Sequence, residues 1–275
     1  NSGYFDHGKY RVVAINRKEK TIIPSGYDEI QAGDIVYFIT MKQNVDFVRE
    51  QAGKALFQVK NAMIMGGSRI AQKTIQYLPN NINTKMLERD KEKCYFLAER
   101  LNNTLIINAD GRNVDALRSE GIQEIDAFVA TTANSEANIL ACLEAKRLGV
   151  KKTVAEVKNI DYIQLAEDLD IGTVINKKMI AASYIYQLTL DADVLEVRSL
   201  TSADAEVVEF VAKEGSKITK SQIKNIRLPE NVNIGGIVRD GVGSIVYGNT
   251  QILPNDHVIV FCISSAIRKV ETLFN

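Results

Sequence analysis

Residues 61–71 read as a buried strand, a glycine-rich turn and the first residues of a helix. The turn contains Gly66 and Gly67, and a turn with so little side chain lets main-chain N–H groups approach a pyrophosphate at the helix N-terminus. Glu88 ends the next apolar run, where a dinucleotide-binding fold carries the carboxylate that accepts ribose hydroxyls. The pattern therefore predicts a dinucleotide-binding fold with its ligand over this turn.

Two residues after the glycines could add to phosphate binding. The Ser68 hydroxyl can donate to a phosphate oxygen, and Arg69 would place a positive charge beside the N-terminal end of the helix dipole. The alternative for Arg69 is a solvated helix residue. Glu88 favours a free 2′-hydroxyl over a 2′-phosphate, so NADP is disfavoured as the ligand.

Strand-like and helix-like segments alternate from about residue 60 to residue 187. The expected strands are 61–65, 85–88, 104–108, 127–131, 153–157 and 171–174. Alternation at this spacing is typical of parallel strands joined by right-handed crossovers. We therefore expect an α/β fold with a Rossmann-like doubly wound parallel sheet.

Further candidate ligand contacts follow the third and fourth expected strands. In this architecture the ligand lies against the carboxyl ends of the strands. The candidates are Asp110 and Gly111 after the third strand, and Thr131, Thr132, Asn134 and Glu136 after the fourth. Ordinary turn chemistry is the alternative explanation for Asp110 and Gly111.

The chain ends in a small α+β domain, and its first 55 residues resemble part of the same unit. Arg17 matches Arg239 and Asp34 matches Asp256 at a common offset (239 − 17 and 256 − 34 are both 222), with a one-residue slip in the strand after the aspartate. Two unrelated β-rich segments are the alternative. We expect domains at 1–55, 56–190 and 191–275. Because the first copy matches only the second half of the unit, we also expect that a preceding nucleotide-binding domain is missing.

Composition excludes several functional classes. Lys and Arg together number 34, as do Asp and Glu, so no overall positive charge indicates a nucleic-acid partner. The three cysteines and two histidines lack the spacing of a metal site, and no nucleophile–base pair is evident, so we assign no metal-binding or catalytic residue. No apolar stretch is long enough to span a bilayer. One segment, 179–188, is apolar nearly all round, and we expect other surfaces to cover it, within its domain or between domains or subunits.

Several motifs resemble those of the RCK/KTN family, and within it of TrkA, the regulatory subunits of Trk-type potassium uptake systems. The matching segments are Gly66-Gly67-Ser68-Arg69-Ile70-Ala71, Leu87-Glu88-Arg89-Asp90, Asn108-Ala109-Asp110-Gly111, 131–138, 145–152, Ile226-Arg227-Leu228-Pro229, 235–239 and 256–261. The resemblance covers nearly the whole chain.

The resemblance implies two small RCK C-terminal-type domains flanking the Rossmann-like sheet. It adds Ile70 and Arg89 to the candidate site and implies NAD(H) or an adenine nucleotide, ADP or ATP, as the ligand. Ser68 and Ala71 stand where the family has glycine, and Glu156 stands where relatives often carry a basic residue, which favours NAD(H) or ADP over ATP. It further implies a non-enzymatic subunit in a homo-oligomeric ring, cytoplasmic and peripheral on the inner face of the membrane, which gates an integral-membrane potassium transporter of the Trk type.

Two other functions stay open. The first is an NAD-dependent oxidoreductase, which the missing catalytic constellation and the duplicated small domain disfavour. The second is a degenerate structural half of the regulator that binds no nucleotide, because of the altered glycine positions.

Overall fold

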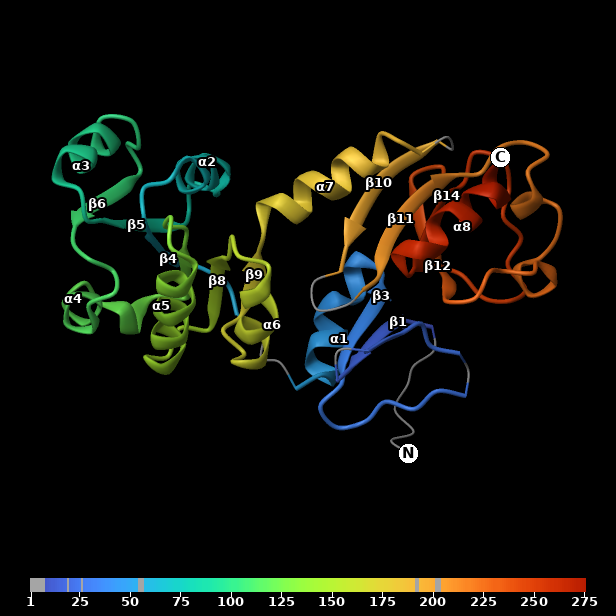
Figure 1. Cartoon of the computed structure of the whole chain (residues 1–275), viewed down its shortest axis with the longest axis horizontal. Helices are drawn as coiled ribbons and strands as arrows, with labels where there is room; N and C mark the ends of the chain where they lie inside the picture. Colours follow the sequence, from blue (N-terminus) through green and yellow to red (C-terminus); the bar gives the residue numbers. More distant parts are fainter. Residues whose placement is uncertain (1–7, 19, 26, 54–56, 191–192, 201–203) are drawn as a thin grey trace. The chain divides into compact units, whose positions relative to one another are not determined.

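The computed structural model describes residues 8–18, 20–25, 27–53, 57–190, 193–200 and 204–275 of the chain (Figure 1). Its contacts divide the chain into two compact units. One unit is Phe57–Lys178, and the other joins the described parts of Asn1–Leu56 and Met179–Asn275.

The unit Phe57–Lys178 is built on a six-stranded sheet in which every pairing is parallel. Its strands are β4 (Asn61–Met65), β5 (Asn83–Glu88), β6 (Thr104–Asn108), β7 (Ala127–Ala130), β8 (Lys152–Glu156) and β9 (Thr173–Ile175). Their order, β6-β5-β4-β7-β8-β9, runs outward in both directions from the central pair β4 and β7. This order confirms the expected Rossmann-like doubly wound sheet, and it puts the switch point beside the glycine-rich turn.

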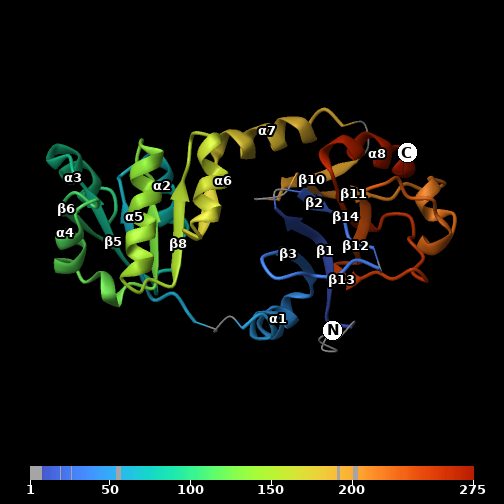
Figure 2. The same ribbon diagram turned by 60° about the horizontal axis from the view of Figure 1, so that its bottom comes forward.

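Helices cover both faces of this sheet (Figure 2). They are α2 (Arg69–Tyr77), α3 (Lys91–Ala98), α4 (Val114–Ser119), α5 (Ser135–Arg147) and α6 (Asp161–Asp168), with a short 3-10 turn at Ile122–Glu124. Successive residues of β4 point to opposite faces, so Ile64 packs with Ala71 of α2 and Leu97 of α3. Met65 points to the opposite face of the sheet, where it packs with residues of α4, α5 and α6.

The second unit contains two antiparallel sheets. The strands of the larger sheet are β10 (Val194–Ser199), β11 (Glu206–Val211), β12 (Val232–Arg239), β13 (Val242–Ile245) and β14 (His257–Cys262), and their order in the sheet is β10-β11-β14-β12-β13. A 3-10 turn at Ser264–Ala266 and helix α8 (Ile267–Phe274) follow β14. Short 3-10 turns also occur at Lys217–Thr219 and Ile223–Asn225. The smaller sheet has the order β2-β1-β3, with strands at Lys20–Ile22, Tyr10–Arg17 and Ile35–Thr40, followed by a turn at Lys42–Asn44 and helix α1 (Val45–Gln51).

The two small sheets confirm the expected repeat, down to the register of their pairing. Asn16 pairs with Ile35, and Val238 pairs with His257, which are the same positions in the two copies. A bulge interrupts β1 after Val12 and β12 at the matching place. The pairing keeps one offset throughout, so the one-residue slip expected from the sequence is wrong.

The first copy packs on the second through these matching strands. The Arg11 guanidinium donates hydrogen bonds to the carbonyl oxygens of Val246 (2.9 Å) and Ile234 (3.3 Å). A Cβ atom at Gly235 would lie 3.2 Å from Cδ1 of Ile39, so the absence of a side chain there allows the close approach. The described parts of the two copies therefore form one packed unit.

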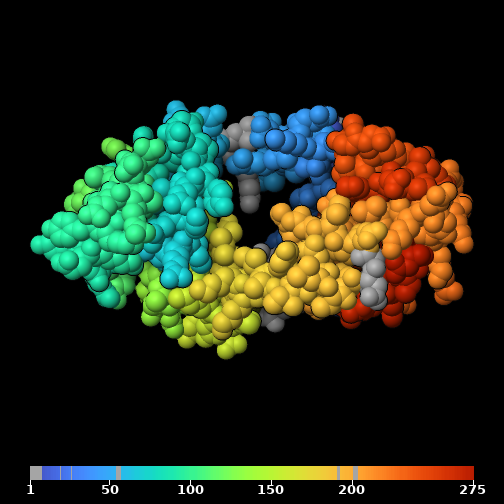
Figure 3. Space-filling view, turned by 90° about the horizontal axis from the view of Figure 1, so that it is seen from above, coloured from blue at the N-terminus to red at the C-terminus, as the bar shows by residue number. Residues whose placement is uncertain are grey.

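Helix α7 (Lys177–Gln187) carries the segment that is apolar nearly all round. Tyr186 packs against the core of the second unit, yet no residue of the helix is fully buried. Ile180, Tyr184 and Ile185 each expose about three-fifths of their surface, at 62%, 61% and 62%. In Figure 3 this helix is coloured yellow to orange. Burial inside its own domain, one of the two expected explanations, is therefore wrong, and packing between domains or subunits stays a prediction.

Candidate functional site

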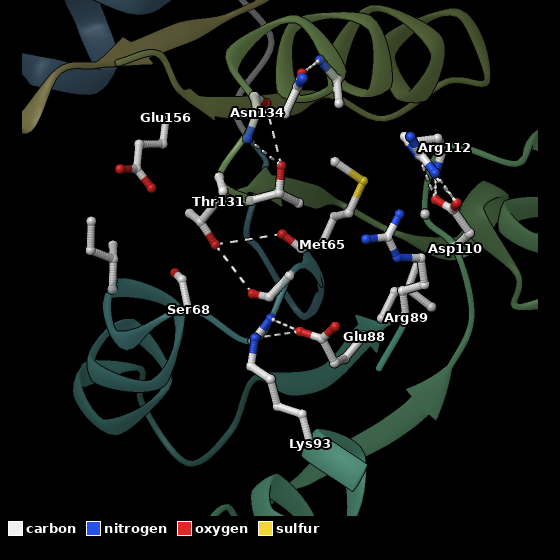
Figure 4. A pocket seen from close by; sticks show the side chains of 18 of the residues that line it. Met65, Ser68, Glu88, Arg89, Lys93, Asp110, Arg112, Thr131, Asn134 and Glu156 are labelled. Carbon is white, nitrogen blue, oxygen red and sulfur yellow. Dashed lines mark hydrogen bonds and ion pairs between the residues drawn. The ribbon is translucent and has the colours of Figure 1, made fainter. Parts of the chain in front are cut away.

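A cavity of about 520 Å³ lies at the carboxyl ends of the parallel strands, where the strand order reverses. Most of the residues expected at the site line it: Gly66, Gly67, Ser68, Arg69, Ile70, Glu88, Arg89, Asp110, Gly111, Thr131, Thr132 and Asn134 (Figure 4). They come from the ends of β4 to β7, in the unit Phe57–Lys178. The sheet topology thus brings segments far apart in the sequence to one cavity.

The glycine-rich turn has a geometry that side chains would disturb. Gly66 has φ +93°, a left-handed conformation that favours glycine. A Cβ atom at Gly67 would lie 2.4 Å from Cδ1 of Leu97 and 3.1 Å from Oε2 of Glu88. Gly67 therefore keeps the turn close to both α3 and the Glu88 carboxylate.

The start of helix α2 offers free main-chain donors to the cavity. Ser68 is the N-cap, and its Oγ accepts the Ala71 N–H at 3.1 Å, which leaves the hydroxyl proton available. Among the described residues, the N–H groups of Ser68, Arg69 and Ile70 have no hydrogen-bond acceptor. Three unpaired N–H groups at a helix N-terminus form a site for an anion such as a phosphate. Serine at the third position of the turn is compatible with this site.

Glu88 is buried beside the turn, with 8% of its surface exposed. Its Oε2 accepts the Gly67 N–H at 2.9 Å and the Lys93 ammonium at 2.7 Å, and its Oε1 accepts the Asp90 N–H at 3.0 Å. Burial opposes ionisation, but these hydrogen bonds outweigh it and lower the pKa of Glu88 below its ordinary value. Glu88 is therefore an ionised acceptor at neutral pH.

After β6, the Asp110 carboxylate forms an ion pair with the neighbouring Arg112. The Arg112 guanidinium binds both carboxylate oxygens, and this contact lowers the pKa of Asp110 to about 2. A Cβ atom at Gly111 would lie 2.6 Å from Cγ of Met65, so the chain passes close to the end of β4. Arg89 lines the same side of the cavity. Asp110 thus fixes the loop and orients Arg112.

Beyond β7, polar side chains hold the loop that leads to α5. The Thr131 hydroxyl donates to the Gly66 carbonyl at 3.3 Å, which ties the loop to the glycine-rich turn. Asn134 caps α5 by accepting the Ala137 N–H at 2.6 Å. Asn134 and Ala137 line the cavity, whereas Glu136 does not, because helical periodicity turns position 136 to another side. Glu136 lines a neighbouring hollow instead.

Several charged residues that line the cavity were not among the contacts expected from the sequence: Lys93, Arg112, Glu156, Lys158 and Lys177. Of these, only Glu156 entered the sequence analysis, through the family resemblance, as a residue that disfavours ATP. Glu156 is the last residue of β8, and the sequence could have indicated it by the rule that selected Glu88. The expected strand ended one residue later, at the apolar Val157, and that placed Glu156 inside the strand.

In the described part of the chain, no helix is both long and apolar enough to cross a membrane. The His, Cys, Asp and Glu side chains of the same residues form no group of three placed to hold a metal ion.

Fold and cavity together define a doubly wound α/β domain with a cleft of the dinucleotide-binding type, joined to paired small antiparallel domains. The TrkA-N domain family matches residues 62–177, and the TrkA-C domain family matches residues 3–53 and 207–275. The chain therefore belongs to the TrkA-N and TrkA-C domain families, which together match most of its length, as its motifs predict.

Individual relatives agree with this membership. A Trk system potassium uptake protein TrkA from Halomonas elongata is 31% identical over 96% of this chain, and the match spans 59% of that protein's length. The crystal structure of the GsuK RCK domain is 13% identical over 84% of this chain and 52% of its own, with a TM-score of 0.51. The GsuK channel bound to NAD is 14% identical over 83% of this chain and 43% of its own, also with a TM-score of 0.51. These two structures confirm the RCK-type fold.

Proposed function

We propose that the chain is the nucleotide-binding part of a regulatory subunit that gates a Trk-type potassium transporter. One observation carries the binding half of this proposal. Free N–H groups of Ser68, Arg69 and Ile70 line the same cavity as the buried Glu88 carboxylate. The first group suits a pyrophosphate and the second suits a ribose.

The ligand we infer is NAD(H) or an adenine nucleotide. Its phosphates would lie over the glycine-rich turn, and its adenosine ribose would meet Glu88. Gly67 supports this placement, because a side chain there would fill the space between the turn and Glu88. The NAD-bound GsuK channel, which has the same fold, supports NAD as a candidate.

Gating follows from binding if the ligand favours one of two arrangements of the domains. A ligand shifts such an equilibrium only by the difference between its affinities for the two states. Copies of the subunit would form a ring on the cytoplasmic face of the membrane, and the transporter would respond to the change in the ring. The TrkA name of the Halomonas elongata relative supports a potassium transporter as the partner.

Calorimetric titration of the purified protein with NAD, NADH, ADP and ATP tests the binding half. We expect Glu88→Ala to weaken every ligand that contains adenosine. Arg69→Ala should reduce the preference for phosphorylated ligands over adenosine, and an unchanged ratio would make Arg69 a surface residue. Wild-type protein that binds none of the four ligands would favour the degenerate structural half.

Potassium uptake tests the regulatory half. Cells that depend on the Trk-type transporter and carry Glu88→Ala should respond less to a change in NAD(H) or adenine nucleotide levels than cells with the wild-type gene. Substrate-dependent turnover of NADH by the purified protein would favour an oxidoreductase instead.

A further inference from the structure

Glu156 and Glu88 occupy equivalent positions in the two halves of the parallel sheet. Glu88 ends β5 in the half formed by β4 to β6, and Glu156 ends β8 in the half formed by β7 to β9. The central strands β4 and β7 lie side by side, with Met65 opposite Ala130. Each of these residues ends its central strand and pairs with the residue just before a glutamate, in β5 or in β8. The two glutamates therefore end equivalent strands on either side of the switch point.

The two positions share further features. An asparagine side chain donates to the main-chain carbonyl of each glutamate, Asn108 to Glu88 at 3.0 Å and Asn138 to Glu156 at 2.8 Å. Both side chains are buried, with 8% and 3% of the residue exposed, and both residues line the same cavity. Glu156 lies across the drawn cavity from Asp110 (Figure 4).

The hydrogen bonding of the two carboxylates differs. Both oxygens of Glu88 accept hydrogen bonds within the described part of the chain, whereas Oε1 of Glu156 is buried there without a hydrogen-bond donor. Its charged neighbour is Lys177, whose Nζ lies 3.4 Å away on a side chain that is 56% exposed. The ion pair offsets part of the cost of burying this charge, but Oε1 keeps unused hydrogen-bonding capacity, which in a ligand cavity suits a donor on the ligand.

The spacing of the strands suggests which donor this is. Two strands separate β5 from β8, so the two carboxylates end strands about 14 Å apart across the sheet. A dinucleotide centred on the glycine-rich turn carries one ribose on each side of its pyrophosphate. A terminal phosphate in the second position would instead bring negative charge against a buried carboxylate.

We propose that Glu156 accepts the hydroxyls of the second ribose, so that the cavity selects a dinucleotide over ADP and ATP. This proposal rests on the proposed function, because it requires that a nucleotide binds over the turn. Glu88 then holds the adenosine ribose, Glu156 holds the other, and the N-terminus of α2 holds the pyrophosphate between them. Glu156 is a specificity-determining residue in this arrangement.

Calorimetric titration of wild-type protein, Glu156→Gln and Glu88→Gln with NAD, ADP-ribose, ADP and ATP tests the proposal. Wild-type protein should bind NAD and ADP-ribose at least about tenfold more tightly than ADP, since a hydrogen bond to a buried charge has this effect on affinity. Glu156→Gln should bring both down to the affinity of ADP, leave ADP itself unchanged and strengthen ATP. Glu88→Gln, the matched control, should weaken all four ligands.

Three results would overturn the role of Glu156: equal wild-type affinities for NAD and ADP, a Glu156→Gln variant that weakens ADP as much as NAD, or ADP-ribose that binds no better than ADP. Unchanged ADP binding in the variant also shows that its cavity is folded. Wild-type protein that binds none of the four ligands would overturn the proposed function itself, so the two failures are distinguishable.

Discussion

The Arg17 guanidinium donates two parallel hydrogen bonds to the Asp34 carboxylate, from Nε to Oδ1 at 2.8 Å and from Nη2 to Oδ2 at 2.7 Å. Arg239 holds Asp256 in the same way in the second copy of the repeat, at 2.7 and 2.6 Å. In both copies the arginine also donates to a main-chain carbonyl of the loop that precedes the aspartate. The pair therefore ties the end of β1 to the loop before β3, and the end of β12 to the loop before β14.

Replacing the second arginine by lysine should destabilise the unit that contains both small sheets. Lysine keeps the charge but cannot form the planar two-bond contact, and the Asp256 side chain is almost fully buried. The Arg239 side chain is 39% exposed, so solvent screens part of the interaction, and we expect Arg239→Lys to cost about 1 kcal/mol. Thermal unfolding measures the change. Arg198→Lys, which alters an exposed pair with Glu196, is the control and should leave the midpoint unchanged.

The same pairs should make stability depend on pH in the acid range. Hydrogen bonds from Arg17 and the Gln31 N–H lower the pKa of Asp34 to about 2. Burial opposes ionisation of Asp256, but the Arg239 contact outweighs it and lowers its pKa as well. A carboxyl whose pKa is lower in the folded than in the unfolded state stabilises the fold above the ordinary value near 4. This stabilisation should disappear as the pH falls from about 4 to about 2.

Urea unfolding at several pH values tests this expected loss of stability in acid. Wild-type protein should lose free energy of unfolding between pH 4 and pH 2, and Asp34→Asn should be less stable at pH 7 with a weaker acid dependence. A variant whose loss between these pH values equals that of the wild type would show that Asp34 is not responsible.

Sequence reasoning located the central strands well because their apolar runs end at turns. The expected bounds of β4 and β6 agree with the structure, and so does the place of the glycine-rich turn. Strand β8 was misplaced by one residue at its end. Val157 is apolar and fully buried, so an apolar run cannot show where the hydrogen-bonded ladder stops. That single residue kept Glu156 from being expected as a ligand contact by its place at a strand end, so it entered the sequence analysis only through the family resemblance.

The register of strand pairing within the repeat is likewise poorly defined by apolar residues alone. Apolar strands match almost equally well at neighbouring offsets, which produced the one-residue slip expected in the sequence. The Arg–Asp pairs have no such freedom, because each guanidinium must meet its own carboxylate. Strand β10 had no such marker, and its alternating sequence at the edge of the sheet was not recognised. Apolar patterns alone therefore fix neither a strand end nor a register to the residue, whereas the Arg–Asp pairs fix the register.

A single methyl group at the second glycine of the turn should abolish nucleotide binding. In Gly67→Ala the new Cβ would clash with Leu97 and crowd the Glu88 carboxylate, so both the turn and Glu88 must shift. We expect at least a tenfold loss of affinity for NAD by calorimetry, together with some loss of stability. Gly243→Ala is the control, since its Cβ meets Met41 at 3.4 Å, an ordinary contact. Normal NAD binding by Gly67→Ala would place the ligand elsewhere.

Binding should be insensitive to mild acid. The hydrogen bonds that lower the pKa of Glu88 keep this carboxylate ionised below the range in which an ordinary glutamate titrates. Affinity for NAD, measured by calorimetry, should therefore stay level from pH 8 to about pH 5 and fall only below that. Glu88→Gln should bind as weakly at neutral pH as the wild type does in acid. A decline centred near pH 6 would point to a different titrating group.

Helix α7 should mediate contact between copies of the chain, because its apolar side chains are not covered within the compact unit that contains them. Ile180, Tyr184 and Ile185 are each about three-fifths exposed, and exposed apolar groups of this size mark interaction surfaces. Ile185→Glu should reduce the mass measured by light scattering while leaving the thermal midpoint of the monomer unchanged, since its side chain supports no core. Lys178→Glu, an exposed change near the start of the same helix, should leave the mass unaltered. If Ile185→Glu keeps the wild-type mass, the assembly surface lies elsewhere; if it unfolds, the helix is needed within each copy.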